Sequence, residues 1–432
     1  MSLQGWGRFP RFKSTIIKYQ DKEQLGEILS TPLTIIAYGN GRSYGDSALN
    51  DTIIHMKPHD YFIDFDDTSG LLHVQSGVLL ADILEYFVPK GWFFKVTPGT
   101  KLITIGGAIA SDVHGKNHHA AGCFSETIKE FEIMLADGSI VICSKELTPE
   151  LFKATCGGMG LTGIILNAKI YLKSINSQFI DQTTIKTKNL RETFDAFEQY
   201  KKANYSVAWI DCLAKGNDLG RCLLMAGDFR DDGRLDYNHS NKFDIPFNFP
   251  SIALNNWSVR AFNWLYYGKV KERITKQKVG IDEFFYPLDT VGHWNRIYGK
   301  KGFTQYQCVF PKASSYSGLQ EMLKTISDSG KGSFLAVLKL CGETNDNYLS
   351  FPLEGYSLAL DFKMEAGILE LLDKLDNIIA KYNGRIYLAK DARVNKDIFE
   401  LGYPQIEAFR QYRRTHKMNL KFESLQSKRL KI

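Results

Sequence analysis

Three glycine-rich loops within the first 165 residues carry the clearest chemical signal in this sequence. The first loop, Gly39-Asn-Gly-Arg-Ser-Tyr-Gly-Asp46, follows an apolar run; the second spans Pro98–His114 and the third Gly157–Gly163. Glycine lets a ligand approach the main chain closely. Successive backbone N–H groups in such loops form concavities that suit phosphate oxygens. The three loops predict one large phosphate-bearing cofactor held mainly by backbone.

The third loop contains Gly158-Met-Gly-Leu-Thr-Gly163, which matches the letters of a dinucleotide-binding fingerprint. That fingerprint requires a strand before the glycines and a helix after them. Here a helix-like segment, Pro149–Thr155, precedes them and a strand-like segment follows. We therefore reject a Rossmann site at this position.

His114, His118 and His119 at the end of the second loop have a spacing that metal ligands also show. A structural zinc site needs four ligands from Cys, His or carboxylates, and the sequence offers no obvious partner for these histidines. We expect no metal. Lys116 between them is expected to be a solvated or phosphate-facing cation rather than a catalyst.

The elements that must position these loops alternate short strands with helices. Leu71–Phe87 reads as strand, turn and helix, and Glu130–Val141 reads as a hairpin around an Asp-Gly turn. Ile164–Leu172 alternates like a half-buried strand. Glycine density falls around Ser174–Gln182, a plausible boundary in a chain whose 432 residues exceed one ordinary core. Beyond it, Leu190–Lys201 reads as an amphipathic helix.

Composition narrows the class of protein. The net charge of +6 is a mild bias that fits an anionic ligand or membrane surface but does not argue for nucleic acid. The seven cysteines are widely spaced without a CxxC pair, which favours a reduced compartment. The N-terminus lacks the apolar region of a signal peptide. We expect a cytoplasmic protein.

Many separated motifs, taken in order, resemble the FAD-binding domain of vanillyl-alcohol-oxidase-type flavoproteins. Within that superfamily the chain is similar to the decaprenylphosphoryl-β-D-ribose oxidases, the flavin half of a 2′-epimerase. The motifs that carry the resemblance are Gly5-Trp-Gly-Arg8, Gly39–Asp46, Pro98-Gly-Thr100, Thr104-Ile-Gly-Gly107, His114–His119, Gly160–Ile165, Trp294-Asn-Arg296, Gln305-Tyr-Gln307, Ser333-Phe334, Lys339-Leu340, Ser350-Phe-Pro352 and Tyr387-Leu-Ala-Lys-Asp391.

The resemblance implies an α+β fold with two lobes. One lobe would be the FAD-binding domain, residues 1–178 completed by 385–432. The other, residues 179–384, would be an antiparallel-sheet substrate domain covering the flavin. Related oxidases attach FAD through a histidine where this chain has Arg42, so the resemblance implies non-covalent FAD.

The resemblance also implies site residues. It places His114 by the flavin, where imidazole can titrate or donate a hydrogen bond near neutral pH, and makes His114 and Lys390 the catalytic candidates. Tyr44 is either a core aromatic or a gate for cofactor or substrate. The implied substrate-binding residues are Tyr44, Lys116, Gln307, Lys339, Ser357 and Lys390. The implied cofactor-binding residues are Gly39, Asn40, Gly41, Arg42, Ser43, Tyr44, Gly45, Asp46, Gly99, Thr104, Ile105, Gly106, Gly107, Ser111, His114, Gly115, Asn117, Gly160, Ile164 and Tyr387.

The implied activity is oxidation of a secondary hydroxyl, at C2, of a polyprenylphosphoryl pentose to the keto sugar. A nicotinamide-dependent short-chain reductase would complete the epimerisation to the arabinose form. Two alternatives remain open: an oxygen-using alditol or aldonolactone oxidase, and a scaffold that has lost its chemistry. The first lacks support from a His-Trp-Gly-Lys-like C-terminal motif, which this chain does not have.

One stretch allows two interpretations. Residues 257–278 mix five Trp, Phe or Tyr side chains with six Lys or Arg side chains. This composition suits an ordinary surface helix, and it equally suits a helix lying at a membrane interface. A lipid-phosphate substrate would make peripheral association with the inner membrane face useful.

Overall fold

The first lobe of the computed structural model contains two sheets. The model describes residues 2–238, 243–250 and 253–432. The apolar run before the first loop forms β4 (Ile35–Tyr38), which pairs in parallel with β5 (Thr52–His55), itself parallel to β3 (Thr15–Ile17). A short hairpin of β1 (Ser2–Gln4) and β2 (Arg11–Lys13) and helix α1 (Lys22–Ser30) flank this sheet.

The second sheet of this lobe is antiparallel, in the order β10-β9-β11-β7-β6, with β8 also pairing with β11. The predicted hairpin is confirmed, because β9 and β10 pair around a turn in which Gly138 has φ +82°. The helices of this part are α2 (Leu80–Phe87), α3 (Ile105–Ala110), α4 (His118–Ala121) and α5 (Pro149–Thr155). The strands are β6 (Phe62–Asp66), β7 (Leu71–Gln75), β8 (Trp92–Phe94), β9 (Ile128–Met134), β10 (Ile140–Cys143) and β11 (Ile164–Ser174).

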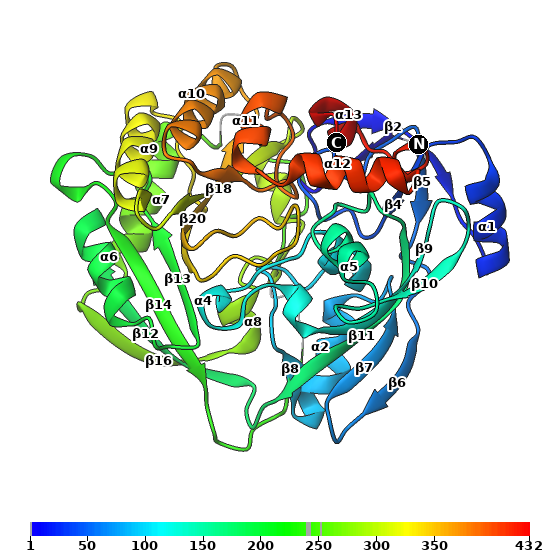
Figure 1. The fold of residues 1–432 in the computed structure, drawn as a ribbon. Helices are drawn as coiled ribbons and strands as arrows, with labels where there is room; N and C mark the ends of the chain where they lie inside the picture. Colours follow the sequence, from blue (N-terminus) through cyan, green and yellow to red (C-terminus); the bar gives the residue numbers. More distant parts are fainter. Residues whose placement is uncertain (1, 239–242, 251–252) are drawn as a thin grey trace.

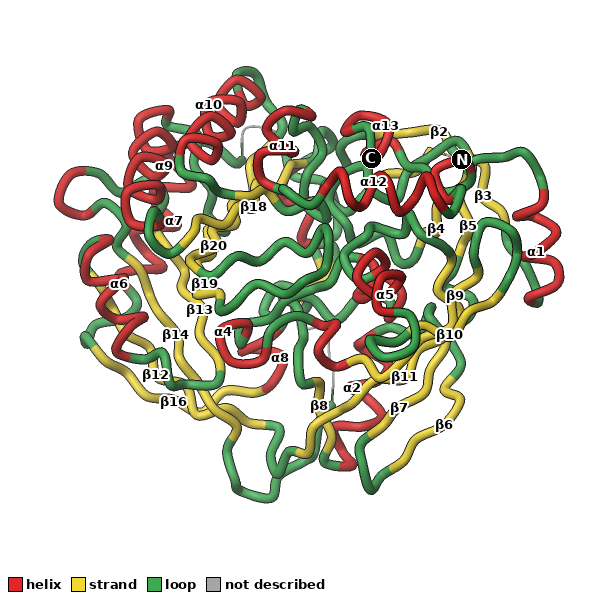
Figure 2. Tube along the Cα trace, viewed as in Figure 1, coloured by secondary structure: helices red, strands yellow, loops and turns green. Residues whose placement is uncertain are grey.

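The other lobe is built on an eight-stranded antiparallel sheet in the order β16-β12-β14-β13-β19-β20-β18-β21. Figure 2 shows helices α6, α7, α9 and α10 on its outer side. The strands are β12 (Phe179–Thr187), β13 (Tyr205–Ile210), β14 (Cys222–Phe229), β16 (Ile274–Gly280), β18 (Phe303–Pro311), β19 (Ala336–Cys341), β20 (Gly355–Lys363) and β21 (Arg385–Ile386). The helices are α6 (Leu190–Gln199), α7 (Asn256–Gly268), α8 (Ile281–Phe285), α9 (Ser315–Ser329) and α10 (Ile368–Lys381). A two-residue pairing joins β15 (Phe243–Asp244) to β17 (Val291–Gly292).

The chain returns to the first lobe after β21. Helices α11 (Lys396–Gly402), α12 (Ile406–Thr415) and α13 (Leu425–Leu430) lie near both termini (Figure 1). The amide of Ile35 donates to the carbonyl of Lys421, and Glu423 donates back to Ile35. The C-terminal segment therefore extends the parallel sheet that carries the first loop.

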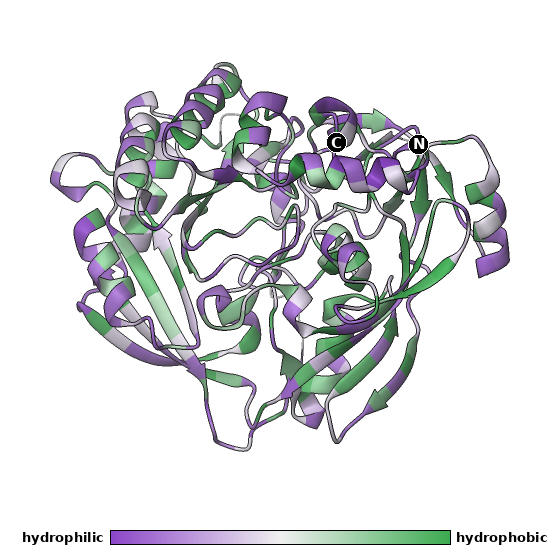
Figure 3. Ribbon diagram, in the orientation of Figure 1, coloured by the Kyte–Doolittle hydropathy of each residue, from purple (hydrophilic) through white to green (hydrophobic). Residues whose placement is uncertain are grey.

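Hydrophobic residues concentrate on the strands of both sheets, as the green colour in Figure 3 shows. One large apolar cluster fills the antiparallel sheet of the first lobe, and another lies beneath the helices of the eight-stranded sheet. A third, aromatic cluster of Tyr44, Trp294, Tyr298 and Phe303 joins the first loop to the second lobe. Among the described residues no helix is long and apolar enough to cross a membrane.

Candidate flavin and substrate site

The three glycine loops converge on one place between the lobes. Asn40 donates its side-chain amide to the carbonyl of Leu102 at 2.8 Å, which ties the first loop to the second. A Cβ on Gly39 would lie 2.5 Å from the hydroxyl of Thr104, so only glycine allows this approach. The amide of Met159 donates to Ala110 at 2.8 Å, which fixes the third loop against the end of α3.

The first loop has the free backbone donors that an anion needs. Among the described residues, the amides of Gly39 through Ser43 donate to no protein acceptor. Gly41 has φ +62°, which turns the loop back on itself. Five successive unused N–H groups form an anion-binding concavity. The prediction of a phosphate cradle at this loop therefore has a structural basis in its backbone.

The second loop was expected to bind phosphate through its backbone, but several of its amides are already occupied. The amides of Ile105, Gly106 and Gly107 already donate to Val78, to Ser76 and to the side chain of the N-cap residue Thr104. These three amides are therefore not free to bind phosphate, and the segment serves to shape the wall. Gly99 does face open space, since a Cβ there would meet nothing within 4 Å.

The remaining first-loop side chains anchor the loop. The guanidinium of Arg42 lies 3.9 Å from the ring centroid of Trp6, and the Ser43 carbonyl accepts from the Trp6 amide. Asp46 is held by a bidentate contact from Arg429. A Cβ on Gly45 would lie 1.7 Å from the carbonyl of Asp391, so this glycine allows the C-terminal segment to close against the loop.

The eight-stranded sheet presents a polar face to these loops. Residues on β18, β19 and β20 share this face because Lys339 pairs with Ser357 and Gln307 pairs with Ala359 across adjacent strands. The Gln307 side-chain amide lies 3.3 Å from the Ser357 hydroxyl. Ala359 leaves a small, unreactive position between them. The predicted substrate residues Gln307, Lys339 and Ser357 are thus brought together.

His114 is fully enclosed at the junction of the two lobes. The Gln307 amide nitrogen donates to its Nε2 at 3.1 Å, while among the described residues Nδ1 has no partner. Burial, followed by the charge of Lys339, holds the pKa of His114 well below its usual range. Of the two expected roles, titration near neutral pH is disfavoured, because a cation here would be both desolvated and next to other cations.

Lys390 lies close enough to His114 for its charge to lower the pKa of that imidazole. Its Nζ lies 3.8 Å from the ring centroid of Tyr44, a cation–π contact that places both predicted residues in the site. Burial lowers the pKa of Lys390, the Lys339 charge lowers it further, and the Asp361 carboxylate opposes both. The neutral amine is therefore accessible near neutral pH.

Two further lysines give the site an excess of positive charge. Lys116 is not solvated as expected: its ammonium donates to the Phe284 carbonyl, and burial lowers its pKa to about 7. Burial also lowers the pKa of Lys339. Among the described residues, neither lysine forms an ion pair with a carboxylate. Such a site favours an anionic ligand.

The other predicted cofactor-binding residues form the walls of the site. Asn117 donates to the Lys95 carbonyl, and the Tyr387 hydroxyl donates to the Ser111 carbonyl while its ring stacks on Phe351. Gly115 is packed against Thr97, Gly160 has φ +78°, and Ile164 is buried at the start of β11.

The two remaining histidines are committed to backbone groups. His118 accepts from the Gly342 amide, and His119 contacts the Ala203 carbonyl. Within the described ranges, no group of three or more His, Cys, Asp or Glu could hold a metal ion.

The sequence reasoning missed three buried carboxylates. Asp361 lies two residues beyond Ala359 on β20, so strand alternation places it on the site face and could have found it. Asp112 accepts from Ser125, Asn345, Asn347 and Ser350, and Asp289 accepts from Thr100 and Lys101. These two join the lobes through contacts that lie far apart in sequence.

The residues present fit a flavin dinucleotide. The first loop offers free amides for a pyrophosphate, Gly99 leaves open space, and the buried Nδ1 of His114 lacks a protein partner among the described residues. Lys116 and Lys339, which form no ion pair among the described residues, suit an anionic group beside the flavin. The donor set, made of backbone and cations, is what phosphate and an electron-rich ring require.

Comparisons with known proteins agree with this geometry. A family model described as an FAD binding domain matches residues 17–144. The bovine L-gulonolactone oxidase is 28% identical over 171 residues, covering 39% of this chain and 38% of that protein. Cytokinin dehydrogenase 2 of Arabidopsis thaliana is 27% identical over 163 residues, covering 38% and 30%.

A third relative covers the whole chain. Decaprenylphosphoryl-beta-D-ribose oxidase of Mycolicibacterium smegmatis is 34% identical over 456 aligned residues, which include 100% of this chain and 97% of that protein. The expected cofactor, FAD, and the α+β class are confirmed. The chain is an FAD-dependent oxidoreductase that belongs to the decaprenylphosphoryl-β-D-ribose oxidase family.

Proposed function

We propose that this protein oxidises the C2 hydroxyl of a pentose carried on a polyprenyl phosphate, such as decaprenylphosphoryl-ribose, to the 2-keto sugar. The observation that carries the proposal is the placement of Lys390 over Tyr44, within range of the Lys339 charge on the polar face that Lys339 forms with Gln307 and Ser357. The relative from Mycolicibacterium smegmatis, which matches along its whole length, is named for the same substrate.

Lys390 is the base in this proposal. The free amides of the first loop would hold FAD without a covalent bond, and the flavin would supply the two-electron oxidising capacity for the substrate carbon. The hydroxyl proton passes to the neutral amine of Lys390, whose pKa burial has lowered toward neutrality. His114 stays neutral and, with Gln307, orients the sugar by hydrogen bonds. The proposal therefore assigns proton transfer to Lys390 and hydrogen bonding to His114.

The two remaining cations suit the phosphate of the substrate. Lys339 lies on the polar face next to Ser357, and Lys116 lies close enough for the Lys339 charge to lower its pKa. A phosphodiester between them would restore both pKa values toward their usual range. The keto sugar would leave for a separate nicotinamide-dependent short-chain reductase, which would deliver hydride to C2 from the other face.

Anaerobic mixing with candidate substrates tests this proposal. Short-chain prenylphosphoryl-ribose is expected to bleach the visible flavin band, whereas xylitol and a sugar lactone are not. Bleaching by the polyol or the lactone alone would overturn the substrate class and favour the lactone-oxidase alternative. A purified protein that binds no FAD would overturn the enzyme assignment itself.

A membrane-facing surface is part of the proposal, because the lipid tail must remain in a bilayer. Helix α7 packs through buried Val259 and Asn263, yet Trp257, Trp264 and Leu265 are 83%, 67% and 61% exposed on one face. Spacings of seven and eight residues place these three side chains together. Exposed aromatic and aliphatic anchors of this kind are typical of interfacial helices.

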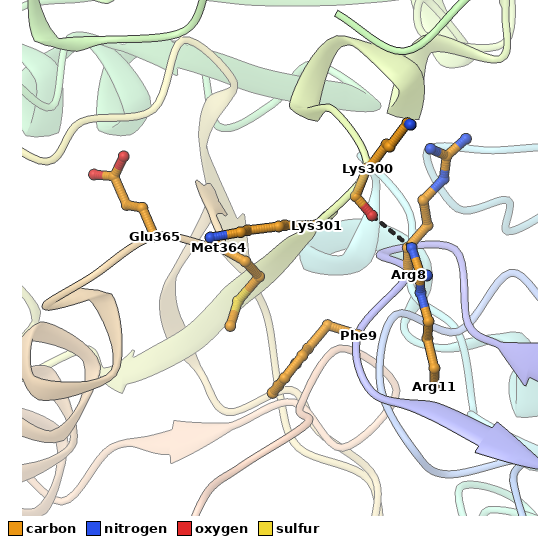
Figure 4. Close-up of a pocket in the computed structure, with 7 residues that line it drawn as sticks. All are labelled: Arg8, Phe9, Arg11, Lys300, Lys301, Met364 and Glu365. Carbon is orange, nitrogen blue, oxygen red and sulfur yellow. Dashed lines mark hydrogen bonds between the residues drawn. The ribbon is translucent and has the colours of Figure 1, made fainter. Parts of the chain in front are cut away.

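A basic hollow of about 540 Å³ lies between the N-terminal segment and the chain around Lys300 and Met364 (Figure 4). Its cations, Arg8, Arg11, Lys300 and Lys301, face one carboxylate, Glu365, and the apolar Phe9 and Met364 complete its lining. Glu365 and Leu254, just before α7, also line a neighbouring cleft. An excess of cations beside apolar side chains suits anionic lipid headgroups.

Vesicle sedimentation tests this surface. The wild-type protein is expected to sediment with vesicles that contain phosphatidylglycerol and to remain free with phosphatidylcholine alone. The W257A/W264A and K300E/K301E variants should each lose most of this binding, while the K312E variant, at an exposed residue just after β18, should retain it. Equal binding by all four proteins would contradict the proposed surface.

A further inference from the structure

Asp361 is a buried carboxylate in the site that has no role in the reaction proposed above. It is 1% exposed on β20, and the Gln305 side-chain amide donates to its Oδ1 at 2.5 Å. Within the described part of the chain, Oδ2 has no hydrogen-bond partner. A buried carboxylate oxygen without a partner is uncommon and calls for water or a function.

A second orphaned polar atom belongs to a residue of the same cleft. The hydroxyl of Tyr298, 3% exposed, lies near the Asp361 carboxylate but closes no hydrogen bond of ordinary geometry among the described residues. Tyr298 and Asp361 both line a narrow cleft of about 40 Å³. About 10–15 Å³ is enough for one water, provided that polar groups hold it. The cleft therefore has the size and the polar groups to hold water against Asp361.

The cleft leads away from the site toward solvent. Besides buried Tyr298 and Asp361, it is lined by exposed Asn256 at the start of α7 and exposed Glu365 after β20. Asp361 shares its face of β20 with Ser357 and Ala359, and its charge acts on Lys390. Asp361 is thus the residue at which the enclosed site and a water-sized path to the surface meet.

Charge coupling links Asp361 to the proposed base. The groups that face this pair are Tyr44, Tyr298 and Lys339. Burial raises the pKa of Asp361 while the Lys390 charge lowers it, and the Asp361 charge in turn raises the pKa of Lys390. A proton gained by one group therefore favours its loss from the other.

We propose that Asp361, with water in the adjoining cleft, is the outlet through which the substrate proton leaves Lys390 for solvent. This inference rests on the proposed role of Lys390. The O–H proton moves to the neutral Lys390 amine as the C–H hydride moves to FAD. The ammonium then passes its proton through water to the Asp361 carboxylate, which releases it along the cleft. One proton reaches solvent for each two-electron oxidation, and Lys390 is again neutral.

A single-turnover experiment under anaerobic conditions separates hydride transfer from proton release. Flavin bleaching and the colour of a pH-indicator dye are followed together after mixing with short-chain prenylphosphoryl-ribose. In the wild type, proton release is expected to keep pace with bleaching. In D361N, which keeps the acceptor for Gln305, release should lag bleaching by at least about tenfold, a loss typical of a missing proton-transfer group.

Two further variants and a pH profile complete the test. Y298F should lag less than D361N, and E370Q, which removes an exposed carboxylate on α10 outside the cleft, should behave as wild type. In D361N the acid limb of the bleaching rate should move to lower pH, because Lys390 loses a favourable negative neighbour. Proton release in step with bleaching in both D361N and Y298F would overturn the outlet. A wild type that no prenylphosphoryl sugar bleaches would instead overturn the proposed function.

Discussion

Two groups of half-buried cations in this protein differ in the direction in which their surroundings shift the pKa. At the base of the first loop, Arg429 lies 2.8 Å from both Asp46 and Asp391. Burial opposes its charge, but the two carboxylates hold the pKa of Arg429 above its usual range. In the site, Lys116, Lys339 and Lys390 are half-buried without an ion pair among the described residues, and their pKa values are lowered.

The contrast separates scaffold from site. Paired charges fix two distant parts of the chain, since Asp46 belongs to the first loop and Arg429 to α13. Unpaired buried charges destabilise the fold and persist where a ligand or a reaction uses them. Removing Arg429 should therefore lower mainly the stability of the fold, whereas removing a lysine of the site should lower mainly the rate of the reaction.

The largest effect on stability is expected from Arg429→Met. This change leaves Asp46 and Asp391 buried without a counter-charge, which typically costs about 3–5 kcal/mol. Urea unfolding of the FAD-loaded protein measures the loss. Arg414→Met, at an exposed pair with Glu407, should change stability by no more than about 0.5 kcal/mol. A loss at Arg429 as small as that would remove the distinction between the two groups.

The largest effect on chemistry is expected from Lys390→Met. Flavin reduction by substrate should slow by about 10²–10⁴-fold, the usual contribution of a positioned base. The free energy of unfolding should stay equal or rise, because a desolvated amine is replaced by an apolar side chain of similar length. Lys374→Met, on the exposed side of α10, is the control. A variant that is inactive and also unfolded would place Lys390 with the scaffold.

Lys116 should make stability depend on pH. Between pH 7 and the ordinary lysine value of 10.5, the unfolded chain keeps a proton that the folded protein has lost. Stability therefore rises with pH across this window wherever the unfolded state binds more protons. The unfolding free energy of the wild type should therefore increase relative to that of Lys116→Met as pH is raised from about 7.5 to 9.5. A constant difference would show that Lys116 is solvated after all.

The smallest effect is expected from Lys339→Gln. Its charge lowers the pKa values of both Lys116 and Lys390. Removing that charge should raise the pKa of Lys390, so the acid limb of flavin reduction moves to higher pH, opposite to the shift expected for D361N. Lys339→Arg should leave the limb in place. The pH dependence of the bleaching rate distinguishes these outcomes.

Local patterns predicted much of this architecture because they depend on neighbours in sequence. The Asp-Gly turn of Glu130–Val141, the strand from Ile164 and the helix after Asn189 appear where periodicity and capping place them. The alternation of side chains along β20, which places Asp361 on the site face, could also have been predicted from the sequence. The state of the backbone amides could not be predicted in this way. The amides at the start of α3 are occupied because Ser76 and Val78, on a different segment, accept from them, whereas no part of the described chain accepts from the first loop.

The sequence by itself determined the cofactor class and the residues available for chemistry, since glycine spacing and motif order need no folding to be seen. Only the tertiary structure decided their protonation. His114 is neutral and Lys390 readily deprotonated because both are desolvated beside Lys339, a residue more than 200 positions from one and about 50 from the other. Burial and the nearness of charges are properties of the folded chain alone.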